Sequence, residues 1–194
     1  MNINQREEQI PEEEFRALND MLSKIKVRLV SSAPRGGFGT HRSMTFGLTR
    51  HRYKGRELRP SWASLKYPEM HKEIFRLGEL HCPHPFTSIH LNSNVTCPPH
   101  VDGNNNGEST VVSFGDYAGG NLVVEGIQYD AYCKPITFDG NVLKHWNTPD
   151  LVGKKFSLVY YNTIHLAKAR LVPSRCVPSR CVPSRCVPAP WFPY

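Results

Sequence analysis

The chain has 194 residues and a formal net charge of +7 at pH 7, and this length suits one domain with a sizeable core plus an appendage. No apolar run approaches the length of a membrane span, and the polar start MNINQREEQ is unlike a secretory signal peptide, so no membrane partner is expected. Of the six cysteines, three belong to a tandem repeat; the others are Cys82, Cys97 and Cys133. Their scattered spacing predicts reduced thiols in an intracellular protein.

The positive charge is unevenly distributed along the sequence. Residues 35–76 carry ten basic and three acidic groups, residues 77–167 carry four and eight, and residues 168–194 carry five and none. The basic excess therefore lies in one internal segment and in the C-terminal tail. A polyanion such as DNA or RNA is the partner that these two segments suit.

Two amphipathic helices are predicted in the first half of the chain. Residues 1–10 are polar and are expected to be a flexible terminus. A helix over 11–26 follows from Pro11, from glutamates in the first turn, and from apolar residues at helical spacing. Those apolar residues are Phe15, Leu18, Leu22 and Ile25. A second helix is predicted over 67–80, with Pro68 at its start.

The segment 42–62 interleaves basic and aromatic residues: Arg50, Arg52, Lys54, Arg56 and Arg59 with Phe46, Tyr53 and Trp62. Cations placed around aromatic rings contact phosphates and stack on exposed bases, as single-stranded or flipped nucleotides require. The alternative is a solvated basic hairpin beside the core. On the first interpretation, Arg50, Arg52 and Tyr53 are candidate nucleic-acid contacts.

Strands dominate the second half of the chain. FTSIHLN (86–92) alternates polar and apolar residues, as a half-buried strand does. Further strands are predicted at 110–114, at 122–124, within 127–139 and at 156–162. GDYAGGN (115–121) is expected to be the hairpin connection between the first two of these.

The C-terminal tail, 169–194, repeats VPSRC three times and ends in further prolines. Proline at this density prevents helix and sheet and favours extended polyproline geometry without a core, so a disordered tail is predicted. It is either a slipped short-repeat expansion or an arm that binds proline-recognition domains or polyanions.

His100 and Asp102 are the strongest candidates for chemistry. Side chains two apart in an extended chain project from the same face, and the preceding Cys97-Pro98-Pro99 forces an extended approach. One further histidine from a distant strand would complete a three-ligand site that leaves the opposite metal positions open, as a non-haem Fe(II) oxygenase requires. His145 and His165 are the candidates.

The order of these features resembles the double-stranded β-helix of the Fe(II)/2-oxoglutarate dioxygenases. Within that superfamily, HVDGNNNGESTVV and KKFSLVYY look most like the TET/JBP group, which oxidises 5-methylpyrimidines in nucleic acid. The resemblance covers roughly residues 86–163. It implies an α+β, mainly β, jelly-roll domain over 11–168, with helices flanking the N-terminal side.

The resemblance also implies a ligand set and two cofactors, Fe(II) and 2-oxoglutarate. Family order puts the third ligand upstream of the cation that binds the co-substrate, which favours His145 over His165. Lys155 and Ser157 match the Arg-x-Ser that grips the far carboxylate of 2-oxoglutarate. Lysine gives a point charge in place of the arginine fork, so a different small acid such as ascorbate is an alternative.

Two asparagines complete the candidate site. Asn92 is expected to hydrogen-bond the co-substrate, and Asn105 to contact nucleic acid. The implied activity is hydroxylation of a C–H bond, most directly the methyl of a 5-methylpyrimidine flipped out of DNA or RNA. The alternatives are a prolyl, other protein or small-molecule hydroxylase of the same superfamily, and a non-catalytic β-helix domain that binds nucleic acid.

Overall fold

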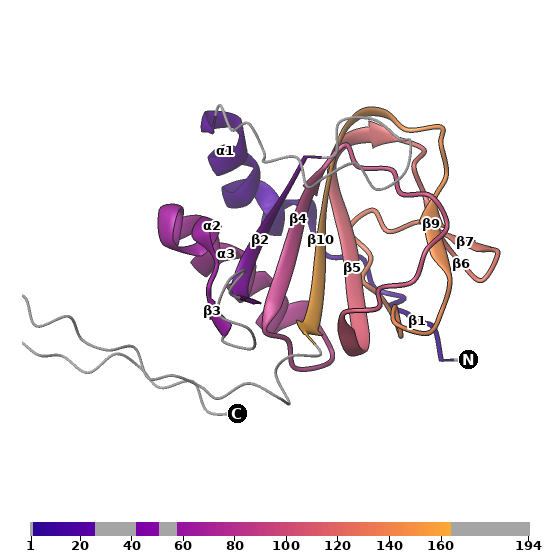
Figure 1. The fold of residues 1–194 in the computed structure, drawn as a ribbon. Helices are drawn as coiled ribbons and strands as arrows, with labels where there is room; N and C mark the ends of the chain where they lie inside the picture. Colours follow the sequence, from indigo (N-terminus) through magenta and orange to yellow (C-terminus); the bar gives the residue numbers. More distant parts are fainter. Residues whose placement is uncertain (1, 26–41, 51–57, 164–194) are drawn as a thin grey trace, which may run out of the picture.

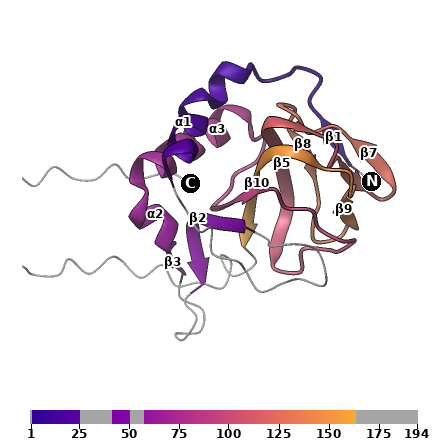
Figure 2. The ribbon, with the colours of Figure 1, turned by 90° about the horizontal axis from the view of Figure 1, so that it is seen from above.

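A computed structural model describes residues 2–25, 42–50 and 58–163. Within these residues the strands form a seven-stranded sheet of order β1-β8-β5-β10-β4-β2-β3 and a three-stranded sheet of order β7-β6-β9. The strands are β1 (Asn4–Gln5), β2 (Arg42–Arg50), β3 (Leu58–Pro60), β4 (Ser88–Ser93), β5 (Asn105–Ala118), β6 (Leu122–Val124), β7 (Ile127–Tyr129), β8 (Ile136–Phe138), β9 (His145–Asn147) and β10 (Val152–Thr163). Figures 1 and 2 show the small sheet beside the large one, with the helices grouped away from it. No helix in the described ranges is long and apolar enough to cross a membrane.

The two predicted helices pack against the large sheet on the face opposite the small sheet. The 3-10 turn η1 (Glu12–Phe15) leads into α1 (Arg16–Lys24), which confirms a helix within the predicted 11–26. The second predicted helix is confirmed as α3 (Pro68–His81), with proline in its first turn. A short helix that the sequence analysis missed, α2 (Trp62–Lys66), precedes it.

The main core lies between these helices and the large sheet. Helix residues Phe15, Leu18, Ile74 and Leu77 are almost fully buried against Ile89 and Leu91 of β4 and Leu158 and Tyr160 of β10. Strand alternation turns the intervening residues of β4 and β10 to the other face of the sheet. The apolar residues of β4 and β10 therefore pack against the helices. The polar residues of these strands, such as His90, Asn92 and Ser157, face the small sheet.

A second cluster joins the small sheet to β8. It contains Leu122 and Val124 of β6 and Ile136 and Phe138 of β8, all buried. The mainly β fold with two sheets and N-terminal flanking helices confirms the predicted jelly-roll class. The tail 169–194 lies outside the described residues, so the proposed domain division remains a prediction.

Two local expectations differ from the structure. Asn4 and Gln5 pair with β8, and Ile10 is buried, so apolar anchors order part of the stretch 1–10 for which a flexible terminus was expected. The hairpin prediction for 115–121 is wrong, because β5 continues to Ala118 while β6 pairs with β7 and β9. Gly119 and Gly120, with φ of 70° and 60°, turn the chain from one sheet to the other.

Candidate metal centre

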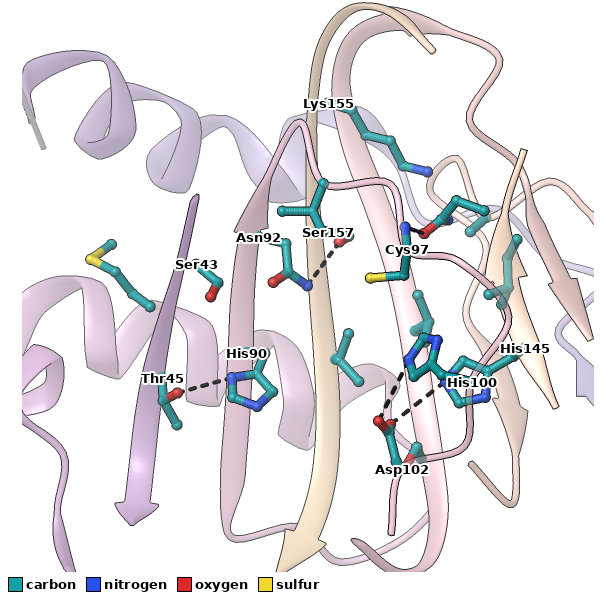
Figure 3. Close-up of a pocket in the computed structure, with 18 of the residues that line it drawn as sticks. Ser43, Thr45, His90, Asn92, Cys97, His100, Asp102, His145, Lys155 and Ser157 are labelled. Atoms are coloured by element: carbon teal, nitrogen blue, oxygen red, sulfur yellow. Dashed lines mark hydrogen bonds and ion pairs between the residues drawn. The ribbon is translucent and has the colours of Figure 1, made fainter. Parts of the chain in front are cut away.

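His100, Asp102 and His145 converge on one point between the two sheets. One ligand atom from each lies within 4.8 Å of the others. Nε2 of His100 is 3.7 Å from Oδ1 of Asp102, and Nε2 of His145 is 3.6 Å from Oδ2. Figure 3 shows the three side chains facing one another. The structure thus brings together the three residues that the sequence analysis combined.

Backbone pairing positions all three side chains. His100 and His145 form an isolated antiparallel bridge, in which each amide donates to the other carbonyl, at 3.0 and 2.9 Å. The amide of Asp102 donates to the carbonyl of Gly140 at 2.7 Å. The Cys97-Pro98-Pro99 segment therefore leads into a short paired stretch, and Asp102 follows it two residues after His100.

Hydrogen bonds fix which ring nitrogen of each histidine carries the proton. Nδ1 of His100 lies 2.8 Å from the carbonyl of Pro98, and Nδ1 of His145 lies 2.9 Å from the carbonyl of Leu143. A carbonyl only accepts, so each Nδ1 is the donor and each Nε2 of a neutral ring presents a lone pair to the cluster. Metal-binding histidines are oriented in this way by a second hydrogen bond.

The donor set fits a divalent cation. Two imidazole lone pairs and a carboxylate aimed at one point would repel one another unless a positive charge lies between them. The Nε2–carboxylate distances exceed those of direct hydrogen bonds and leave room for an ion. Two histidines and one carboxylate on one side of the ion are the combination typical of non-haem Fe(II) oxygenases.

Asn105 bonds one of the candidate ligands. Its side chain is buried, and its amide nitrogen donates to Oδ2 of Asp102 and to Oγ of Ser109, both at 3.1 Å. The amide nitrogen is therefore bonded within the protein, and the contact of Asn105 with nucleic acid stays a prediction. Asn105 orients the carboxylate, and the signal was its place three residues after Asp102, where a turn folds it back.

The cluster opens into a cavity of about 530 Å³ between the sheets, a size typical of small-molecule sites. The large sheet contributes Thr45, His90, Asn92 and Val159, and the small sheet contributes Leu122 and Trp146. His90 is bonded through Nδ1 to Thr45 at 2.9 Å and through Nε2 to the hydroxyl of Tyr161 at 3.1 Å. These bonds tie the His90 ring to side chains of β2 and β10.

Lys155 is the buried cation among the described residues that line this cavity. Its ammonium donates to the carbonyl of Gly120 and lies 5.2 Å from the ring centroid of Tyr117. Burial lowers the pKa of Lys155 to about 8, and the nearby carboxylates of Asp130 and Asp150 oppose this shift. The ammonium is thus held in a site of low polarity, where it attracts an anion strongly.

Two polar side chains accompany Lys155 on the cavity wall. Ser157 follows two residues later on β10, and Asn92 donates to its hydroxyl at 3.4 Å from the neighbouring β4. Figure 3 shows Lys155, Ser157 and Asn92 on β10 and β4, beside the metal cluster. The three residues predicted to bind a co-substrate therefore share the cavity with the three candidate ligands. Lys154 points to the other face, where its ammonium lies over the ring of Phe156.

The remaining predicted contacts cannot be placed. Arg52, Tyr53 and His165 lie outside the described residues, and Arg50 is described only as the last residue of β2. Trp62, one of the aromatic residues of the basic segment 42–62, lies on the wall of the cavity.

No protein-family model and no curated protein matches this sequence. Solved structures do match its fold. NgTET1 in complex with 5mC DNA aligns with a TM-score of 0.57 and 13% identity, over 80% of this chain and 70% of that one. A 2OG-Fe(II) oxygenase family oxidoreductase from Burkholderia pseudomallei aligns with a TM-score of 0.50 and 16% identity, over 77% and 78%. The chain has the fold of these oxygenases. At such low identity the likeness concerns the fold alone.

Proposed function

We propose that this protein is an Fe(II)- and 2-oxoglutarate-dependent dioxygenase that hydroxylates a C–H bond. The observation that carries the proposal is the presence of His100, Asp102 and His145 in the same cavity as a buried cation, Lys155. When bound, Fe(II) with 2-oxoglutarate and O₂ would supply the oxidising chemistry that amino-acid side chains lack.

The protein's own residues supply geometry and charge. The two imidazoles and the carboxylate hold one side of the ion, and their hydrogen bonds to Pro98, Leu143 and Asn105 fix their orientation. The Lys155 ammonium pairs with the far carboxylate of the co-substrate, and the Ser157 hydroxyl donates to it. Apolar wall residues such as Val159 exclude water from the space between.

The substrate that we favour is the methyl group of a 5-methylpyrimidine in DNA or RNA. Support comes from the resemblance of HVDGNNNGESTVV and KKFSLVYY to the TET/JBP group, and from the basic character of residues 35–76. NgTET1, whose fold is similar, was solved in complex with 5mC DNA. A base must leave a duplex to reach such a cavity, so single-stranded substrates are the natural first test.

Succinate release coupled to mass spectrometry tests the proposal. Purified protein with Fe(II), ascorbate and 2-oxoglutarate is incubated with a 5-methylcytosine oligonucleotide, with proline-rich peptides, or with neither. We expect succinate and a product that has gained one oxygen atom for the oligonucleotide, and neither for His100→Ala. A hydroxylated peptide would identify a protein hydroxylase instead. Oligonucleotide binding without succinate would identify a non-catalytic binding domain.

A further inference from the structure

Trp62 is a large aromatic residue whose side chain is exposed at the edge of the candidate active site. It is the first residue of α2, lines the same cavity as the metal cluster, and leaves 55% of its surface exposed. Exposing an indole forfeits the burial that stabilises most tryptophans. Exposed aromatic residues on the wall of a pocket are typical of ligand-contacting positions.

The helix that carries Trp62 is fixed to the large sheet. Ser61 caps α2, because its hydroxyl accepts from the amide of Ser64 at 3.1 Å, and its own amide donates to the carbonyl of Gly47 at 2.8 Å. The amide of Gly47 in turn donates to the Ser64 hydroxyl at 2.8 Å. Ser61, Ser64 and Gly47 are all buried. The backbone at Trp62 is therefore already ordered in the free protein. A ligand that contacts the indole loses little further conformational entropy on binding.

A cation and a second aromatic ring lie beside Trp62. The ammonium of Lys66 lies 4.8 Å from the indole centroid, and Tyr67 packs edge-on against the indole at 6.0 Å. In sequence, β2, β3 and α2 carry Arg42, Arg50, Arg59 and Lys66 and no acidic residue. One face of the indole thus carries a cation, and a planar ligand with a nearby negative charge would suit the other face.

Trp62 and the metal cluster lie at opposite ends of the cavity. Helix α2 packs against β2, whereas Asp102 leads into β5, and β10 and β4 lie between these two strands. Figure 3 shows Ser43 and Thr45 of β2 across the cavity from the cluster. Three strand spacings correspond to about 14 Å. This separation exceeds the width of one base, so a ligand that spans both ends must extend over more than one nucleotide.

We propose that Trp62 is a stacking platform for a base that neighbours the reacting base on the same strand, with Lys66 next to the backbone phosphate. This inference rests on the proposed function, and it adds a substrate contact that sets the minimum substrate length. The proline-rich tail is a poorer occupant, because residues 168–194 carry five basic groups and no acidic one. Like charge on the tail and on Lys66 disfavours that contact.

Binding of short single-stranded oligonucleotides tests the platform without requiring turnover. Fluorescence anisotropy compares the parent with Trp62→Ala, Trp62→Phe and Leu65→Ala; Leu65 is 71% exposed on the same helix and serves as the matched control. We expect Trp62→Ala to weaken binding of a 5-methylcytosine pentamer roughly 10- to 100-fold. Trp62→Phe should recover most of the affinity, and Leu65→Ala should bind as the parent does. Unchanged circular dichroism establishes that each variant is folded.

Abasic oligonucleotides locate the contact. Each base beside the 5-methylcytosine is replaced in turn by an abasic sugar. At one of these positions the replacement should weaken binding to the parent and leave the affinity of Trp62→Ala unchanged. Equal losses in both proteins at every flanking position, or full affinity in Trp62→Ala, would overturn the inference.

The two proposals fail separately. Trp62-dependent binding without succinate overturns the oxygenase alone, whereas succinate release with Trp62-independent binding overturns the platform alone.

Discussion

His100 and His145 exchange both of their backbone hydrogen bonds across an antiparallel bridge, although they lie far apart in the sequence. Their ring centroids are consequently 4.3 Å apart. Two of the three candidate ligands are thus positioned by main-chain pairing, and side-chain hydrogen bonds to Pro98 and Leu143 set the rotation of the rings. The geometry of the site therefore depends on the fold more than on flexible side chains.

Replacing His145 by alanine should abolish metal binding. Two ligands cannot hold the ion in the geometry that three provide, so affinity for Fe(II) or Mn(II) should fall by more than roughly 100-fold, beyond the loss expected for a supporting residue. Isothermal titration calorimetry under anaerobic conditions measures this metal affinity. His90→Ala is the matched control, since His90 lines the same cavity but bonds Thr45 and Tyr161. Metal loss in His90→Ala but not in His145→Ala would refute the ligand assignment.

Replacing Asn105 by alanine should weaken metal binding without removing a ligand. The change deletes the 3.1 Å hydrogen bond that orients Oδ2 of Asp102, and supporting bonds of this kind are worth roughly 10- to 100-fold in metal affinity. The same titration measures the loss. Asn162→Ala is the control, because the amide of Asn162 bonds the carbonyl of Pro85 and not a candidate ligand. Equal affinities of Asn105→Ala and the parent would show that Asn105 has no orienting role.

Affinity for 2-oxoglutarate should decrease as pH rises above about 8. Burial lowers the pKa of Lys155 to about 8, so the ammonium that attracts the carboxylate is present below this pH and lost above it. The dissociation constant should then rise by up to about tenfold per pH unit. In Lys155→Arg, the guanidinium stays charged and the profile should be flat over this range. A flat profile in the parent would place the co-substrate away from Lys155.

Gly78 of α3 lies directly against the rings of Phe86 and of Tyr160 in β10. A Cβ at this position would lie 2.4 Å from Cζ of Phe86 and 2.5 Å from Cε1 of Tyr160. Gly78→Ala should therefore destabilise the protein by about 1–3 kcal/mol through overpacking, despite the higher helix propensity of alanine. Urea unfolding measures this change, with Gly103→Ala as a control in open space. Equal stability of Gly78→Ala and the parent would mean that α3 is not packed this closely.

Sequence patterns anticipated the elements whose signal is local. The alternation in FTSIHLN correctly separated Ile89 and Leu91, which are buried in the core, from His90 and Asn92, which line the cavity. Proline with an acidic first turn likewise indicated the start of the first helix. The spacing of His100 and Asp102 indicated a shared face, and the structure places His145, the predicted third ligand, beside them.

Elements that depend on distant pairing were less predictable. Asn105 is a different case, because its partners Asp102 and Ser109 are close in sequence, but three asparagines in a row do not indicate which of them bonds the carboxylate. The glycines at 119 and 120 resemble a hairpin, and only the pairing of β6 with β9 shows that they connect two sheets. Helix α2 did carry a local signal, because Ser61 is a capping residue in front of a short run of helix formers.

Anaerobic addition of Fe(II) and 2-oxoglutarate to the purified protein tests the central claim most directly. A co-substrate that chelates the ion held by His100, Asp102 and His145 should produce a metal-to-ligand charge-transfer band in the visible spectrum. We expect this band in the parent protein and its loss in His100→Ala, with both proteins folded. Absence of the band from the folded parent, at saturating Fe(II) and 2-oxoglutarate, would contradict the proposal that these three residues form an oxygenase centre.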